Sequence, residues 1–141
     1  MKTEGMLALE DPEGDGLRFQ ASFAARTLIL DDTKGAADAS PVQAMLAALV
    51  ACSAMDVVSI LRKKRQVLTR YEISMSGERA DEHPRRFLSI DCVHRISGRG
   101  LKRRAAEEAL QLSLEKYCSV SHCLRPDLPV RHVIEIVETG G

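Results

Sequence analysis

Two of the four cysteines lie in segments where a sulfur atom could do chemistry. Cys52 is in the middle of the apolar residues 47–58, and Cys118 follows a charged and aromatic segment, residues 115–117. A thiolate is a nucleophile, whereas a buried neutral thiol is a small hydrophobic side chain. Taken alone, each cysteine is explained as a core residue. The spacing along the chain does not establish that the two sulfur atoms meet.

The remaining cysteines and the histidines are expected to have structural roles rather than catalytic ones. Cys92 alternates with apolar residues, and His94 falls on the same face, so both are expected in the core, whereas His132 is expected at the surface. His122 and Cys123 follow Cys118 at a spacing that fits no common zinc pattern. We therefore expect no metal and no cofactor.

A long helix must position Cys52. Ser40 is a suitable N-cap, Pro41 fits the first helical position, and Gln43 completes a capping box, after which helix-forming residues continue to about Arg65. Such a helix is about 37 Å long, which is enough to span a chain with a radius of gyration of about 14 Å. Its first four turns are apolar on nearly every face, and all faces must then be covered. A second copy of the chain would supply that cover, which predicts a homodimer.

The chain shows no internal repeat, and its predicted strands and helices do not strictly alternate. Segregated strands and helices indicate an α+β fold with antiparallel pairing, and the whole chain, residues 1–141, is expected to form one domain. The predicted strands are residues 17–23 and 27–30, which form a hairpin, then 71–75, 88–96 and 130–137, with a second helix over residues 101–117.

The composition excludes several classes of function. The 141 residues carry 20 basic and 20 acidic side chains, so no basic excess exists to bind nucleic acid. The first 40 residues do not form a signal peptide. Residues 39–61 contain Gln43, Ser53, Asp56 and Ser59 and are judged too polar for a membrane span. We expect a protein that is cytoplasmic and not bound to membranes, with cysteines that are not structural disulfides.

Several segments together are similar to a known family. The chain resembles the OsmC/Ohr family of thiol peroxidases, most closely its OsmC-like branch, from about residue 17 to residue 137. The matching segments are Ser40-Pro41 at the start of an Ala- and Leu-rich helix, residues 47–58 around Cys52, the sequence Glu-Lys-Tyr-Cys-Ser-Val at residues 115–120, and Gly98 before the second helix.

The resemblance implies both a fold and a reaction. It implies an intertwined homodimer in which curved antiparallel sheets pack on long central helices, with two active sites at the dimer interface. Cys52 would attack an organic hydroperoxide, and Cys118 would resolve the resulting sulfenic acid as a disulfide, with Cys123 as an alternative resolving thiol. A dithiol, in parts of the family a lipoylated protein, would reduce the disulfide.

The activation of Cys52 needs a cation from elsewhere in the fold. Cys52 lies about twelve residues after the N-cap, beyond the reach of the helix dipole, and burial would raise its pKa. The family uses an arginine held by a glutamate, for which Arg26 fits better than Arg18. Val42 and Gln43 stand where that glutamate is expected, and Gln43 can hydrogen bond to a guanidinium without neutralising it.

This departure from the family pattern leaves two other functions open. One is a non-enzymatic dimer that binds a small apolar ligand in its interface. The other is a thiol redox sensor with slow turnover. The negative charge of Asp56, one turn beyond Cys52, would disfavour a thiolate, and an arginine of the sheet or of a partner chain is expected to pair with it.

Overall fold

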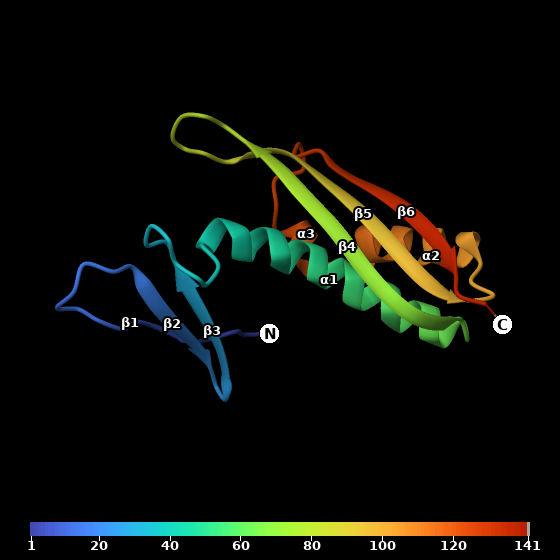
Figure 1. Cartoon of the computed structure of the whole chain (residues 1–141), viewed down its shortest axis with the longest axis horizontal. Helices are drawn as coiled ribbons and strands as arrows, with labels where there is room; N and C mark the ends of the chain where they lie inside the picture. The colour runs from blue at the N-terminus through green and yellow to red at the C-terminus, as the bar shows by residue number, and fades with distance from the viewer. Residues whose placement is uncertain (141) are drawn as a thin grey trace. The chain divides into compact units, whose positions relative to one another are not determined.

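The computed structural model describes residues 1–140. It contains two compact units, Met1–Ala47 and Ala48–Gly141, each of which has its own three-stranded sheet. Figure 1 shows the elements in chain order from blue to red. The expected α+β class is confirmed, and the assignment of the whole chain to one domain stays a prediction.

The first unit is built on an antiparallel sheet of order β1-β2-β3. Its strands are β1 (Met6–Leu9), β2 (Arg18–Phe23) and β3 (Arg26–Asp31). The predicted hairpin is β2–β3, in which Phe23 pairs with Arg26. Strand β1 was not predicted, because its four residues are all apolar and show no alternation of apolar and polar positions, and all four are exposed in the structure.

Helix α1 (Pro41–Lys63) begins with the predicted capping box. The Ser40 N–H donates to Oε1 of Gln43 at 3.0 Å, and the Gln43 N–H donates to Oγ of Ser40 at 3.2 Å. At the other end Arg65 has a positive φ of 58°, and the Gln66 N–H donates to the Leu61 carbonyl oxygen at 3.0 Å. This residue in the left-handed region ends the helix close to Arg65, where the sequence predicted its end.

The second unit contains the sheet β4-β5-β6. Strands β4 (Val67–Arg79) and β5 (Phe87–Arg99) are antiparallel, and β6 (Val130–Glu138) pairs with β5 in parallel. The expectation of antiparallel pairing throughout is therefore wrong for β6. The chain between β5 and β6 is long enough to cross back over the sheet, and such a crossover is what a parallel pair requires.

The connection from β5 to β6 contains three short helical pieces. They are α2 (Arg103–Leu112), the π-helical turn η1 (Ser113–Tyr117) and α3 (Ser119–His122). The predicted helix over residues 101–117 is thus an α-helix that widens in its last turn, where the Cys118 N–H donates to the Ser113 carbonyl oxygen at 2.7 Å. π-turns of this kind are frequent at functional sites.

The core of the second unit joins helices α1 and α2 to the sheet. Figure 1 shows α1 and α2 on the same side of β4–β6. Val57 and Leu61 of α1 contact Ile96 of β5, together with Ala106 and Ala109 of α2, and all five are almost completely buried. The small alanines allow α2 to approach α1 and the sheet closely.

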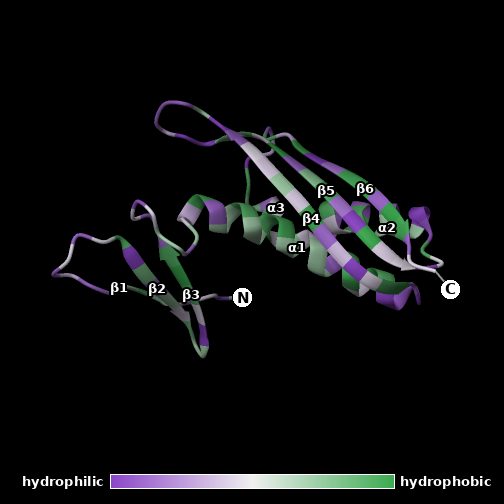
Figure 2. Ribbon diagram, in the orientation of Figure 1, coloured by the Kyte–Doolittle hydropathy of each residue, from purple (hydrophilic) through white to green (hydrophobic). Residues whose placement is uncertain are grey.

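Much of α1 remains uncovered within one chain. Figure 2 shows this helix as hydrophobic over most of its length, yet Met55 is 70% exposed and only 28% of its most apolar window of 18 residues is buried. By length and composition α1 could cross a membrane, so the expectation that this stretch is too polar to do so is wrong. Core helices of soluble proteins pass the same test of length and composition.

Candidate thiol site

The structure brings Cys52 and Cys118 together. Cys52 is half-buried in α1, and Cys118 is fully buried between η1 and α3. The Cys52 side chain lies close enough to that of Cys118 to influence its pKa, and both residues are free thiols. Two sulfur atoms that are 66 residues apart in the sequence are therefore neighbours, an arrangement that permits disulfide chemistry.

The surroundings of Cys118 favour its protonated form. Burial raises the pKa of this thiol most, and the adjacent Cys52 raises it further, against a lowering by the hydroxyl and backbone N–H of Ser121. Burial disfavours the charged form because a thiolate loses its hydration there. Cys52 is the more exposed of the two sulfur-bearing residues. The pair is therefore asymmetric, with an accessible thiol and a buried proton-retaining one.

Four hydrogen bonds fix the backbone of Cys118, one of them from the His122 N–H to the Cys118 carbonyl oxygen at 3.4 Å. The Cys118 N–H donates to the Ser113 carbonyl oxygen across η1 at 2.7 Å. Its own carbonyl oxygen accepts from Oγ of Ser121 at 2.9 Å and lies 2.9 Å from Nδ1 of His122. The widened turn and the start of α3 thus hold the residue from both sides.

A hydrogen bond between Asp56 and Ser113 ties η1 to α1 beside the two cysteines. Oγ of Ser113, which is fully buried, donates to Oδ2 of Asp56 at 2.8 Å. Asp56 lies one helical turn after Cys52, and Ser113 begins the turn that ends at Cys118. Among residues 1–140 Asp56 forms no ion pair, so the expected arginine of the sheet is not its partner. The carboxylate instead aligns the two segments that carry sulfur.

The arginines proposed to activate Cys52 differ in how they are engaged in the first unit. Arg18 forms ion pairs with Glu10 and, at 3.1 Å, with Asp38. Arg26 is exposed at the start of β3 and has no ion pair among residues 1–140. Gln43 caps α1 through its side-chain oxygen, and the first turn of that helix contains no acidic residue. Roles of Arg26 and Gln43 in stabilising a thiolate stay predictions.

Sequence reasoning missed a chain of three polar side chains across the second sheet. Tyr71 Oη lies 2.6 Å from Nδ1 of His94, and Nε2 of His94 lies 2.9 Å from Nδ1 of His132. His94 is 1% exposed, as expected of a core residue. The expectation that His132 is a surface residue is wrong, because it is half-buried and its Nε2 is fully buried. Its position between apolar residues 130 and 134 was the available signal.

The other two cysteines are separate from this pair. Cys92 is buried in β5, where burial raises the pKa of its thiol. Cys123 is exposed at the end of α3. Among residues 1–140, no three histidine, cysteine, aspartate or glutamate side chains group as metal ligands.

Comparison with known proteins agrees with the paired cysteine segments. The family model described as OsmC-like protein matches residues 33–133, more than half of the chain. The chain belongs to the OsmC family. Protein YhfA of Escherichia coli strain K12 is 39% identical over 124 residues, which cover 87% of this chain and 92% of YhfA. The resemblance drawn from the sequence is thus confirmed.

Solved structures show the same fold. A hypothetical protein from Aquifex aeolicus VF5 is 25% identical, with a TM-score of 0.85 and 99% coverage of both chains. The organic hydroperoxide resistance protein OhrB of Bacillus subtilis is 15% identical, with a TM-score of 0.61 and coverage of 96% of this chain and 98% of OhrB. At that identity the likeness to OhrB is one of fold.

Proposed function

We propose that this OsmC family member is a thiol-dependent peroxidase that reduces organic hydroperoxides with Cys52 as nucleophile and Cys118 as resolving thiol. The observation that carries the proposal is the contact between these two side chains. The fold supports it, because structures with this fold include organic hydroperoxide resistance proteins.

The reaction proceeds in three balanced steps. The Cys52 thiolate attacks the distal oxygen of the hydroperoxide, the O–O bond breaks, and the departing alkoxide takes a proton to become an alcohol. The Cys118 thiol then attacks the sulfur of the Cys52 sulfenic acid, an S–S bond forms, and the hydroxyl leaves as water with the thiol proton. An external dithiol reduces the disulfide to two thiols and becomes a disulfide itself.

The asymmetry of the pair suits this order of events. Burial favours the protonated form of Cys118, so this thiol is the less reactive of the two until the sulfenic acid forms beside it, and its proton then leaves with the hydroxyl as water. The hydrogen bond between Asp56 and Ser113 holds the two segments in register, so the S–S bond can form without a large movement of either helix. Asp56 and Ser113 are therefore positioning residues.

The remaining parts of the proposal concern groups outside this pair. A second copy of the chain covers the exposed apolar face of α1, which gives a homodimer. Arg26 supplies the cation that favours the Cys52 thiolate, and Gln43 contacts it by hydrogen bonding. The protein acts in the cytoplasm, where the reductant is a dithiol, for example a lipoylated protein.

The test is consumption of cumene hydroperoxide with a dithiol as reductant. Cys52→Ser is expected to lose turnover completely. No other described thiol is both accessible to the peroxide and next to a second thiol with which it could form a disulfide. Cys123→Ser, at the exposed cysteine, is the matched control and should retain it. Cys118→Ser should form a sulfenic acid once but no Cys52–Cys118 disulfide. Unchanged consumption by Cys52→Ser would remove Cys52 from the mechanism.

One observation favours a second function, a slow redox sensor. The first turn of α1 lacks an acidic residue to hold an activating arginine, which predicts a less reactive Cys52. A sensor would be oxidised at Cys52 by peroxide without sustained consumption when dithiol is in excess. The ratio of peroxide consumed to protein present separates the two, since a value near one indicates a sensor and a value far above one an enzyme.

A further inference from the structure

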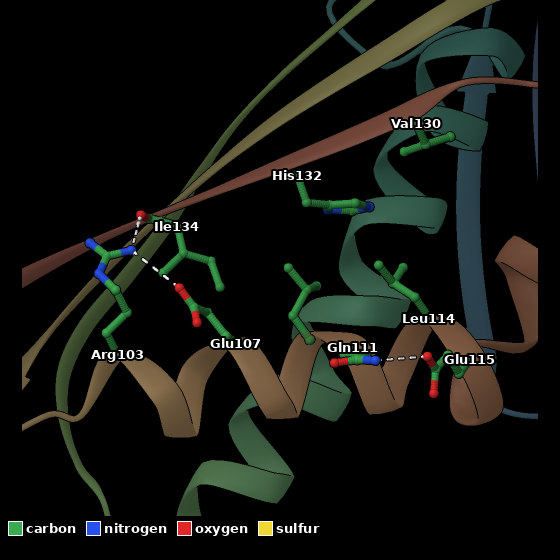
Figure 3. Close-up of a pocket in the computed structure, with 9 residues that line it drawn as sticks. Arg103, Glu107, Gln111, Leu114, Glu115, Val130, His132 and Ile134 are labelled. Atoms are coloured by element: carbon green, nitrogen blue, oxygen red, sulfur yellow. Dashed lines mark hydrogen bonds and ion pairs between the residues drawn. The ribbon is translucent and has the colours of Figure 1, made fainter.

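A second candidate site lies between the helical connection and β6, apart from the cysteines. Here α2, η1 and β6 line an open cavity of about 510 Å³. Figure 3 shows its wall, in which His132 lies on β6 between Val130 and Ile134, with Leu114 nearby on η1. This volume and mainly aliphatic wall are typical of pockets for small molecules.

One polar atom in this wall lacks a partner. Nε2 of His132 is buried and forms no hydrogen bond with residues 1–140. Buried polar groups nearly always have a partner, and an exception requires an explanation such as a ligand or an ordered water. His132, Leu114 and Val130 also line a smaller cavity of about 280 Å³ that includes Ser53 and Ser121. The side chain that carries this atom therefore lines both cavities.

The hydrogen-bond chain behind His132 decides whether this atom carries a proton. Burial raises the pKa of Tyr71, so the phenol is protonated, and its one hydrogen bond among the described residues is to Nδ1 of His94. If the phenol donates there, the neutral His94 carries its proton on Nε2 and donates to Nδ1 of His132. The proton of His132 then lies on Nε2. The reverse order would leave the phenol proton without an acceptor among the described residues.

The polar side chains at the rim of the cavity are already paired. Arg103 donates to the Ile134 carbonyl oxygen at 2.9 Å and lies 3.8 Å from Glu107, and Gln111 donates to Glu115 at 2.9 Å. Figure 3 shows these contacts as dashed lines. The rim holds two carboxylates and one guanidinium, so it does not attract an anion. A neutral hydrogen-bond acceptor suits it better.

We propose that this cavity binds a small neutral molecule with an aliphatic body and a carbonyl oxygen, such as a ketone, and that the carbonyl oxygen accepts a hydrogen bond from Nε2 of His132. Tyr71 and His94 act behind it by fixing the proton on that nitrogen. The aliphatic body contacts Leu114, Val130 and Ile134. The proposal needs no reaction at Cys52 and stands apart from the proposed peroxidase.

The test compares cyclohexanone, cyclohexane and cyclohexanecarboxylate, which share one aliphatic ring. Binding to the full chain is measured by NMR titration, with long-range proton–nitrogen spectra of the histidine rings. Cyclohexanone is expected to bind about tenfold more tightly than either of the others, because it alone offers an uncharged oxygen that accepts a hydrogen bond from Nε2 of His132. Its binding should also shift the Nε2 signal of His132. Equal affinities, no binding, or a long-lived water at Nε2 in place of the ketone would overturn the proposal.

A pair of neighbouring variants sharpens the result. His132→Phe keeps an aromatic ring but removes the donor, so its preference for cyclohexanone over cyclohexane should disappear. Val133→Ala changes the adjacent, exposed residue of β6 and should leave the preference intact. The spectrum of the unaltered protein tests the idea even if His132→Phe does not fold, because a proton on Nδ1 of His132 instead of Nε2 would contradict it.

Discussion

The cysteine pair and the Tyr71–His94–His132 chain both join distant parts of the sequence inside the second unit. The cysteines meet where α1 passes the end of η1, and each lies in a distinctive run of neighbours. The three ring side chains meet across three strands, in the order β4, β5, β6. The family resemblance of two short segments singles out the cysteine pair, whereas the chain of ring side chains becomes visible only when the strand register is known.

The register explains how the rings meet. Tyr71 is opposite Ile96, and His94 is opposite Ile134. Each ring therefore contacts a ring on the next strand that lies two residues before the residue directly opposite. Such a residue is a diagonal neighbour on the same face of the sheet. Since the second step depends on a parallel pair, antiparallel pairing of β6 would have placed a different residue beside His94. Parallel alignment of β6 is thus what creates the chain.

The largest expected effect that separates the two regions is an acid-dependent loss of stability. Burial, together with His132, lowers the pKa of His94 to about 4, whereas an unfolded histidine titrates near 6.5. The unfolded chain therefore binds more protons between these values. The stabilisation is complete above pH 6.5 and falls by about 3 kcal/mol as the pH decreases to 4. Urea unfolding at a series of pH values measures it.

His94→Gln is the comparison for this experiment. The exposed carboxylates titrate alike in both proteins, so the difference between the two stability curves isolates the imidazole. The variant should lose less stability between pH 6.5 and 4 than the unaltered chain. Parallel curves would show that His94 is not held neutral by its surroundings.

A smaller effect is expected at the cysteine pair from Asp56→Ala. This change leaves the buried Ser113 hydroxyl without its acceptor, at a cost of about 1–3 kcal/mol in unfolding free energy. It should also slow formation of the Cys52–Cys118 disulfide after peroxide treatment, as followed by mass spectrometry. Asp56→Asn retains an acceptor oxygen and should recover most of the rate. If both variants formed the disulfide at the original rate, Asp56 would not position the pair.

The smallest effect is expected on the outer face of the same strands that carry the histidines. Arg131 of β6 makes two hydrogen bonds to Asp91 of β5, at 2.7 and 3.0 Å, but both side chains are exposed to solvent. Exposed ion pairs add little because water screens them. Arg131→Ala should therefore unfold at nearly the same urea concentration. A large decrease would mean that outer pairing, rather than the buried rings, holds β6 to β5.

Local signals predicted much of this structure. The capping box at Ser40 and Gln43 placed the start of α1, and alternation placed the β2–β3 hairpin and the second sheet. The family resemblance selected Cys52 and Cys118 as a pair, and the contact between their side chains agrees with it. Each of these signals resides in a few consecutive residues, where propensity and hydrophobic period are readable.

The features that were missed depend on distant contacts. Nothing in residues 130–137 reveals whether that strand runs parallel or antiparallel to its neighbour. The partner of Asp56 is a serine 57 residues away, and no charge pattern announces it. The placement of His132 inside the sheet depends on which face of β6 turns inward, and that face is set by packing against α2 and η1.

The widened turn before Cys118 also has a consequence for protein engineering. A π-helical turn accommodates one residue more than the corresponding α-helical turn. Deletion of a single residue from Ser113–Tyr117 would restore an ordinary helix and rotate the following side chain by about 100° around the helix axis. The sulfur of Cys118 would then face away from α1, so the reach of one cysteine toward the other depends on that single added residue.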